Sequence, residues 1–180
     1  TLLIGGGMAS TFLKANGLGV GASLVEDDKL EDARAIIAEA ADRHVDLGLP
    51  IDAVAGERFA EDAPHQIVAA EAVPDGWLIL DVGPKTVQTY EAKLGPARTV
   101  VWNGPLGVAE WDAFAQGSKD LARYLAKSDA SVIIGGGETV ALVSELGLAS
   151  AYTHVSTGGG ASLEFLEGRE LPGVAALQDA

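Results

Sequence analysis

Residues 131–139 have the sequence Ser131-Val132-Ile133-Ile134-Gly135-Gly136-Gly137-Glu138-Thr139. The residues before the glycines form a short run rich in β-branched side chains, which is typical of a strand buried on both faces. The glycines predict a tight turn, and Glu138 is an acidic residue at the point where the next helix would begin. The stretch therefore predicts a strand, a glycine turn and a helix in direct succession.

The same succession recurs along the chain, which indicates an α/β fold with a mainly parallel sheet. A sixth, less regular strand is predicted at 47–54, because this run contains Pro50. Apolar periodicity and boundary residues predict helices over residues 8–16, 27–44, 85–94, 109–127 and 138–146. The five main strands are predicted at residues 2–4, 77–80, 99–102, 131–134 and 153–155.

Each of the five main strands leads into a turn that contains glycine. In a parallel sheet such turns share one edge, where open α/β sheets bind ligands and where glycine lets a phosphate or a purine approach the backbone. Three separate Gly-Gly-Gly triplets favour a binding role over a purely structural one. The turns are Gly5-Gly6-Gly7, Asp81-Val82-Gly83-Pro84, Asn103-Gly104-Pro105, Gly135-Gly136-Gly137 and Ser156-Thr157-Gly158-Gly159-Gly160.

The charge of the chain restricts how it can hold a ligand. Its 180 residues include 26 acidic and 12 basic ones, the formal net charge is −14, and cysteine is absent. We expect neither nucleic-acid binding nor membrane insertion, because the sequence has no Lys/Arg cluster and no apolar run of roughly 20 residues. A phosphate would need backbone N–H groups, a helix N-terminus or a divalent cation. The P-loop, the dinucleotide fingerprint and the G-x-S-x-G elbow are missing in their required contexts.

Taken in order, the turns resemble the C-terminal, nucleotide-binding domain of the phosphoglycerate kinase family. The resemblance covers nearly the whole chain. It is carried by Gly5-Gly6-Gly7-Met8-Ala9, Leu80-Asp81-Val82-Gly83-Pro84, Val100-Val101-Trp102-Asn103-Gly104-Pro105-Leu106-Gly107-Val108, Gly135-Gly136-Gly137-Glu138-Thr139 and Ser156-Thr157-Gly158-Gly159-Gly160-Ala161-Ser162-Leu163-Glu164.

The resemblance implies a three-layer, Rossmann-like domain over residues 1–180, belonging to a two-domain, monomeric, cytoplasmic enzyme of glycolysis. This family reversibly transfers a phosphoryl group from 1,3-bisphosphoglycerate to ADP, giving 3-phosphoglycerate and ATP. The C-terminal half holds Mg-ATP or Mg-ADP, and a basic N-terminal half holds the glycerate. The chain starts at Thr1 within an apolar run and has no Gly-Gly-Ala-Lys-type strand, which carries the family's phosphate lysines. We therefore expect the first strand and helix and the N-terminal domain to be absent, and the isolated chain to be inactive.

The resemblance also assigns the nucleotide site residue by residue. One group would surround the adenine and the ribose, with two glycines bordering the purine, three aliphatic walls and one acid that accepts from the ribose hydroxyls. Ordinary core packing is the alternative for the three aliphatic residues. The group consists of Gly6, Gly7, Leu24, Leu80, Val108 and Glu110.

A second group would hold the phosphates and the metal. Glu138 would act through Mg²⁺, because a carboxylate beside polyphosphate is repulsive unless a cation separates them. The family usually carries Asp at this position, so direct and water-mediated contact both stay open. Gly158, Gly159 and Gly160 would meet the transferring phosphoryl group. The remaining phosphate contacts would be Asn103, Gly136, Gly137 and Thr139, and Pro105 would be a further nucleotide-binding residue.

Two other classes of function are compatible with parts of this pattern. The runner-up is a stand-alone, non-catalytic nucleotide-binding or interaction module on the same scaffold. A dinucleotide oxidoreductase would require a fingerprint turn and a ribose acid about 20 residues downstream, and the sequence has neither in the right context.

Overall fold

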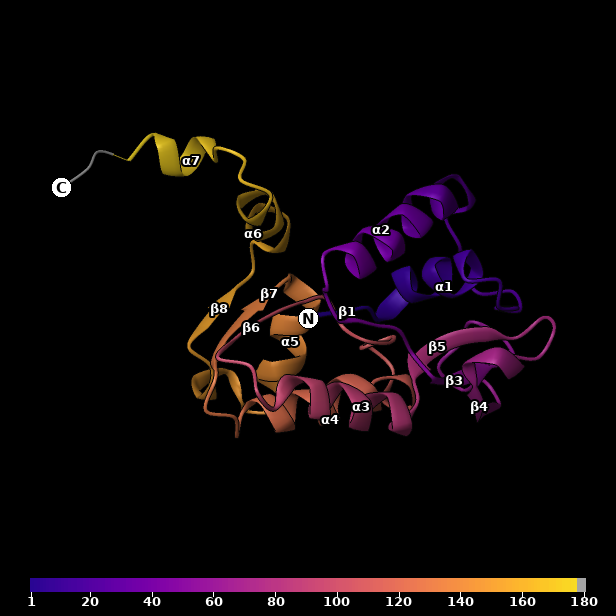
Figure 1. The fold of residues 1–180 in the computed structure, drawn as a ribbon. Helices are drawn as coiled ribbons and strands as arrows, with labels where there is room; N and C mark the ends of the chain where they lie inside the picture. The colour runs from indigo at the N-terminus through magenta and orange to yellow at the C-terminus, as the bar shows by residue number, and fades with distance from the viewer. Residues whose placement is uncertain (178–180) are drawn as a thin grey trace.

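Three small β-sheets carry the fold in the computed structural model, which describes residues 1–177 (Figure 1). The first is parallel and pairs β1 (Leu2–Leu3) with β2 (Leu47–Gly48). The second is antiparallel, in the order β4-β3-β5. The third is parallel, in the order β6-β7-β8. The remaining strand bounds are β3 (Asp52–Gly56), β4 (His65–Ala69), β5 (Leu78–Val82), β6 (Thr99–Asn103), β7 (Ser131–Gly135) and β8 (His154–Ser156).

Helices follow the strands in the order expected of an α/β protein. Pro84 begins α3 at a position where its missing N–H costs nothing, and the helix ends before Gly95. Short 3-10 helices cover Asp27–Lys29, Ala70–Ala72, Asp112–Phe114 and Ala149–Ala151. The α-helices are α1 (Gly6–Ala15), α2 (Leu30–Asp42), α3 (Pro84–Leu94), α4 (Gln116–Leu125), α5 (Gly137–Glu145), α6 (Gly159–Leu166) and α7 (Pro172–Ala175).

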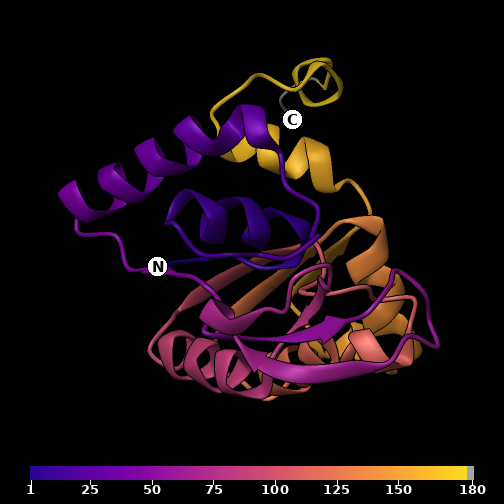
Figure 2. The same ribbon diagram turned by 90° about the vertical axis from the view of Figure 1, so that its right-hand side faces the viewer.

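The apolar core lies where the β6-β7-β8 sheet meets α3, α4 and α5. Its fully buried members include Ile134 on β7, Leu125 on α4 and Val143 on α5. A second cluster joins α1 and α2 to β2, and these two helices form the indigo and purple layer seen in Figure 2. Helices α6 and α7 extend away from the rest of the chain (Figure 1). No helix within residues 1–177 is long and apolar enough to cross a membrane.

A groove separates the two parallel sheets. Its volume is about 410 Å³, and it is lined by Leu2 and Leu3 of β1, by Val100–Trp102 of β6 and by helix residues such as Leu125. Within the described residues, the edges of β1 and β6 that border this groove pair with no other strand. Tyr90 of α3 links the carboxyl ends of β1 and β2. Its hydroxyl donates to the carbonyls of Ile4 at 2.6 Å and Gly48 at 3.2 Å.

The α/β class with parallel sheets is confirmed, but one predicted strand was assigned to the wrong sheet. The run at 77–80 becomes β5, which pairs antiparallel with β3. An apolar run indicates burial and not direction, and the chain after Pro50 continues as β3, along which β5 returns. The partly polar strand β4 was missed, because His65 and Gln66 weaken its apolar pattern. Helix α4 begins at Gln116 rather than at Ala109, after the 3-10 turn Asp112–Phe114.

Candidate nucleotide site at the glycine-rich edge

The turns after β6, β7 and β8 interlock at the carboxyl edge of their sheet. The side-chain amide of Asn103, the last residue of β6, donates to the carbonyl of Gly159 at 3.2 Å. The N–H of Gly136 donates to the carbonyl of Ser156 at 3.1 Å. These bonds hold three predicted glycine turns side by side, as expected for a parallel sheet.

Close backbone packing explains two of the glycines. Gly136 has φ 89°, a conformation that other residues rarely adopt. A Cβ on Gly159 would lie 2.7 Å from the Cα of Gly136 and 2.7 Å from Oδ1 of Asn103. The turns therefore approach each other more closely than side chains would allow, and the surface they form consists largely of backbone.

The N-terminus of α5 adds donors to this surface. Thr139 is buried, and its hydroxyl oxygen accepts from the N–H of Gly104 at 3.0 Å, which leaves its own proton to donate. Gly137 and Glu138 occupy the exposed first turn of the same helix. The first N–H groups of a helix have no partner within it and, with the helix dipole, favour an anion. This end of the site can therefore hold a phosphate without a cationic side chain.

The first glycine turn lies beside the loop that follows β6. The N–H of Gly6 donates to the carbonyl of Leu106 at 3.0 Å, and a Cβ on Gly6 would lie 2.9 Å from the carbonyl oxygen of Pro105. Leu24 is 76% exposed, and its side chain lies near Gly7, where a Cβ would be 3.7 Å away. Four of the five predicted glycine turns thus contact one another or the loop after β6, although β1 belongs to a different sheet from β6, β7 and β8, whereas Gly83 packs on Asp52 instead.

The three predicted aliphatic walls differ in position. Leu80 is 4% exposed and packs in a core cluster with Val54 and Phe114, while Val108 is half-buried at the margin of that cluster. The carbonyl of Leu80 accepts from the N–H of Val108 at 2.9 Å. Leu80 therefore supports the loop 105–108 through its backbone carbonyl. The side chains of Val108 and Leu24 are more exposed than that of Leu80 and so more accessible to a ligand.

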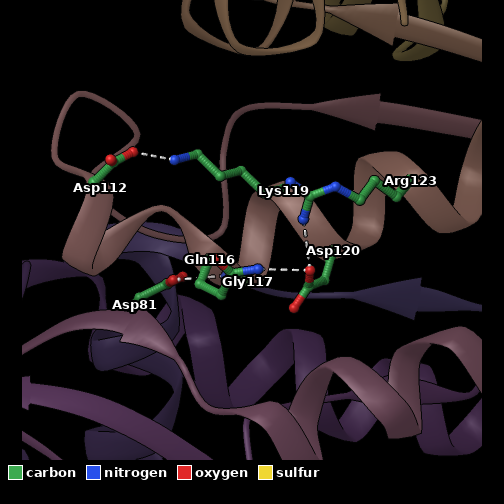
Figure 3. A network of polar contacts seen from close by, with 7 residues as sticks. All are labelled: Asp81, Asp112, Gln116, Gly117, Lys119, Asp120 and Arg123. Atoms are coloured by element: carbon green, nitrogen blue, oxygen red, sulfur yellow. Dashed lines mark hydrogen bonds and ion pairs between the residues drawn. The ribbon is translucent and has the colours of Figure 1, made fainter. Parts of the chain in front are cut away.

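The two predicted site acids share one cavity. Glu110 and Glu138 both line a cavity of about 500 Å³, together with Lys119 and Asp112. Lys119 is the basic residue that lines this cavity, and its ammonium group forms a salt bridge with Asp112 (Figure 3). Within residues 1–177 no three acidic or histidine side chains gather as a metal site. Of the predicted site residues, Glu138 is the carboxylate that could hold a magnesium ion, which commonly takes few protein carboxylates and completes its shell with phosphate or water oxygens.

A wider cavity lies elsewhere and contains none of the predicted site residues. Its volume is about 1000 Å³, and it runs between α3 and α4. Arg98 and Ala130, which precede β6 and β7, line it, so it lies at the amino edge of the sheet. We locate the candidate site at the glycine-rich edge, because ligands of open α/β sheets bind at the carboxyl ends of the strands.

Sequence reasoning missed the residues that hold the loop 105–108 in place. Ser118 is fully buried on α4, and its hydroxyl oxygen accepts from the N–H of Leu106 at 2.8 Å. Asp81 was recognised only as part of a turn, although it is 1% exposed. A lone acid at the end of an apolar strand was the available signal for Asp81, while the signal for Ser118 was its place on the apolar face of its predicted helix, which indicated burial but not a bonding partner.

The fold is that of an α/β protein in which glycine-rich turns meet at the ends of parallel strands, and the candidate site there is made mainly of backbone. A family model described as phosphoglycerate kinase matches residues 1–169. The chain belongs to the phosphoglycerate kinase family.

Individual relatives agree with this assignment. Phosphoglycerate kinase of Moorella thermoacetica is 55% identical over 99% of this chain, and that of Synechococcus sp. is 56% identical over 99%. The solved structure of the Coxiella burnetii enzyme has a TM-score of 0.91 at 45% identity and covers 97% of the chain. The Pyrococcus horikoshii enzyme gives 0.83 at 30% identity over 98%. The chain spans 44–46% of the length of these relatives.

Proposed function

We propose that this chain binds Mg-ATP or Mg-ADP as the nucleotide-binding half of a phosphoglycerate kinase. The observation that carries the proposal is the contact among the turns at Asn103, Gly136 and Gly159, which forms a backbone surface beside the N-terminus of α5. In a chain of net charge −14, the first N–H groups of α5, which lie beside this surface, would supply donors that a polyphosphate requires. The similarity to phosphoglycerate kinases supports the same assignment.

Each part of the edge would then have a defined task. The purine would lie between the Gly6–Gly7 turn and the loop at Pro105–Val108, against Leu24 and Val108, with Leu80 supporting the loop. Glu110 would accept from the ribose hydroxyls. The phosphates would lie on Asn103, Gly136, Gly137 and Thr139, and the transferring group would face Gly158–Gly160. A magnesium ion held at Glu138 would neutralise phosphate charge, which phosphoryl transfer requires.

The whole reaction would need more than these residues. Phosphoryl transfer to ADP from 1,3-bisphosphoglycerate spreads negative charge that lysines, arginines and a metal normally stabilise. Lys119, the cation at the cavity of Glu110 and Glu138, pairs with Asp112. We therefore propose that the chain alone does not turn over, and that an N-terminal domain of a monomeric, cytoplasmic enzyme supplies the glycerate site. The groove between β1 and β6 supports the expectation that a further strand completes the parallel sheet.

Calorimetric titration with Mg-ADP tests nucleotide binding directly. We expect saturable binding that Glu138→Gln weakens about tenfold with Mg²⁺ present and hardly at all when EDTA has removed the metal. Glu145→Gln is the matched control, because Glu145 lines the same cavity from the other end of the same helix. The nucleotide proposal fails if the unmodified chain does not bind. Equal losses with and without metal would remove Glu138 from the metal role.

A further inference from the structure

Asp81 is a buried acid that the proposed chemistry does not use. It lies on β5 with 1% of its surface exposed, and within residues 1–177 it forms no ion pair. Its Oδ2 accepts from the N–H of Gly117 at 2.8 Å, and its Oδ1 accepts from the N–H of Val82 at 2.8 Å. Burial raises the pKa of the Asp81 carboxyl to about 7, while these N–H bonds oppose the rise. A buried carboxyl with a strongly perturbed pKa is a candidate for a functional role.

The charged groups around Asp81 are engaged elsewhere. Figure 3 shows Asp81 below the start of α4, pointing toward Gly117. Asp120, one turn further along this helix, raises the pKa of Asp81 further and is itself bonded to Gln116 and Arg123. Lys119 pairs with Asp112 on the far side of the helix start.

The neighbouring β-strand offers no cation either. On β3, the carboxylate of Asp52 accepts from the backbone N–H groups of Lys85 at 3.0 Å and Thr86 at 2.8 Å, and so caps α3. The Asp81 carboxyl is therefore held by backbone N–H groups, those of Gly117 and Val82 at hydrogen-bond distance, with that of Gln116 also favouring the ionised form.

The carboxyl group of Asp81 fills a space shared by two glycines. A Cβ on Gly107 would collide with Oδ1 of Asp81, and a Cβ on Gly117 would lie 2.7 Å from the same atom. Gly107 belongs to the loop 105–108, whose neighbours are fixed by the bonds from Leu106 to Ser118 and from Val108 to Leu80. The same loop accepts the N–H of Gly6 at Leu106. Contacts thus run from Asp81 through the loop to the first glycine turn.

We propose that Asp81 is a positioning residue, whose ionised carboxyl group binds the start of α4 and packs against Gly107, and thereby sets the separation between the loop 105–108 and the first glycine turn, the two proposed walls of the purine site. This proposal rests on the proposed nucleotide function. Asp81 does not touch the ligand. It acts through Gly107 on Pro105 and Val108, and through Leu106 on Gly6.

Such positioning depends on the charge of Asp81. The ionised group accepts both N–H bonds, whereas the protonated group has a proton to place among atoms that donate to it. Protonation therefore weakens the hold on Gly117 and loosens the loop. Purine affinity falls as the pH decreases through about 7, the pKa of the Asp81 carboxyl.

Adenosine is the probe that tests this inference, because it carries no phosphate that titrates near neutral pH. We expect NMR titrations of the unmodified chain at pH 8 and pH 6 to show affinity roughly three- to tenfold lower at pH 6, the equivalent of one net hydrogen bond. Asp81→Asn is expected to bind with the low affinity at both pH values. Asp52→Asn is the matched control, since Asp52 is a buried acid that caps a different helix, and it is expected to retain the pH dependence.

Amide exchange separates this inference from the nucleotide proposal. The protection factors of the Gly6 and Val108 amides should be lower at pH 6 than at pH 8 in the unmodified chain, and low at both pH values in Asp81→Asn. This readout needs no ligand. Failure of adenosine to bind, combined with these exchange changes, would contradict the nucleotide proposal and keep the positioning role. Equal affinity and equal protection at both pH values would overturn the positioning role of Asp81.

Discussion

The two ends of the candidate site are built in different ways. At the phosphate end, Asn103, Gly136 and Gly159 follow adjacent strands of one parallel sheet and touch directly. At the purine end, the turn at Gly6 follows β1 in a different sheet, and the opposing loop 105–108 is bonded to β5 and α4. The phosphate end is fixed by strand pairing, whereas the purine end depends on a few side-chain and backbone tethers from other elements.

This difference predicts which changes each end tolerates. Backbone turns locked by strand register have no spare volume, so added atoms should disturb the phosphate end most. Tethers such as Asp81 and Ser118 can be weakened by solution conditions or by single substitutions while the sheet remains intact.

The largest effect concerns the pH dependence of stability caused by Asp81. The pKa of its carboxyl in the folded chain is about 7, above the unfolded value of 3.8, so between these pH values the folded chain holds a proton that the unfolded chain has lost. The free energy of unfolding therefore falls as the pH rises from about 4 to about 7, because burying the charge costs more than the N–H bonds of the ionised group return, even though those bonds hold the start of α4 more firmly. Urea unfolding of the unmodified chain should lose about 3 kcal/mol from this group between pH 5 and pH 8.

Asp81→Asn isolates that contribution, because the amide does not titrate. Its stability should vary less with pH, and at pH 8 it should match or exceed the unmodified chain although its purine affinity is lower. If Asp81 had a merely structural role, the substitution would lower both the stability and the purine affinity. Identical pH dependence in the two proteins would show that Asp81 does not carry the raised pKa.

Gly159→Ala tests the tight packing of the phosphate end. The new Cβ would lie 2.7 Å from the Cα of Gly136, so the turns must separate, and we expect the chain to be destabilised by roughly 2 kcal/mol. Gly160→Ala is the control, since a Cβ there has nothing within 4 Å and joins the same helix. Thermal unfolding of both variants measures the difference, and equal melting temperatures would contradict the interlocked arrangement.

The sequence allowed a turn to be predicted where it directly follows a strand. Contacts between elements that are distant in sequence could be predicted much less well. The glycine triplets at Gly5, Gly135 and Gly158 each marked a strand end, and the parallel pairing of β6, β7 and β8 then brought two of them together. The direction of β5 could not be predicted, because burial of Leu80 is compatible with either orientation. Ser118 could not be predicted either, since its value depends on a loop 12 residues away that folds back onto α4.

Ser118→Ala tests a tether at the purine end without altering charge. The change leaves the buried N–H of Leu106 without its acceptor, which should cost about 1–2 kcal/mol of stability. The protection of the Gly6 amide should fall as well, since Leu106 is its partner. Ser144→Ala, at an exposed helix position, is expected to change neither quantity. Unchanged protection at Gly6 would separate the loop from the first glycine turn.

The smallest effect on stability should come from Leu24, whose side chain is 76% exposed beside Gly7. Leu24→Ala should alter the free energy of unfolding by less than about 0.5 kcal/mol, as for most surface positions. If Leu24 covers one face of the purine, adenosine affinity should fall roughly threefold, because part of the aliphatic surface buried by the ligand is lost. Ile67→Ala is the control, since Ile67 is 61% exposed on β4. Because neither substitution should disturb the fold, any difference in affinity between them reports contact with the ligand, and equal affinities would leave Val108 as the purine wall.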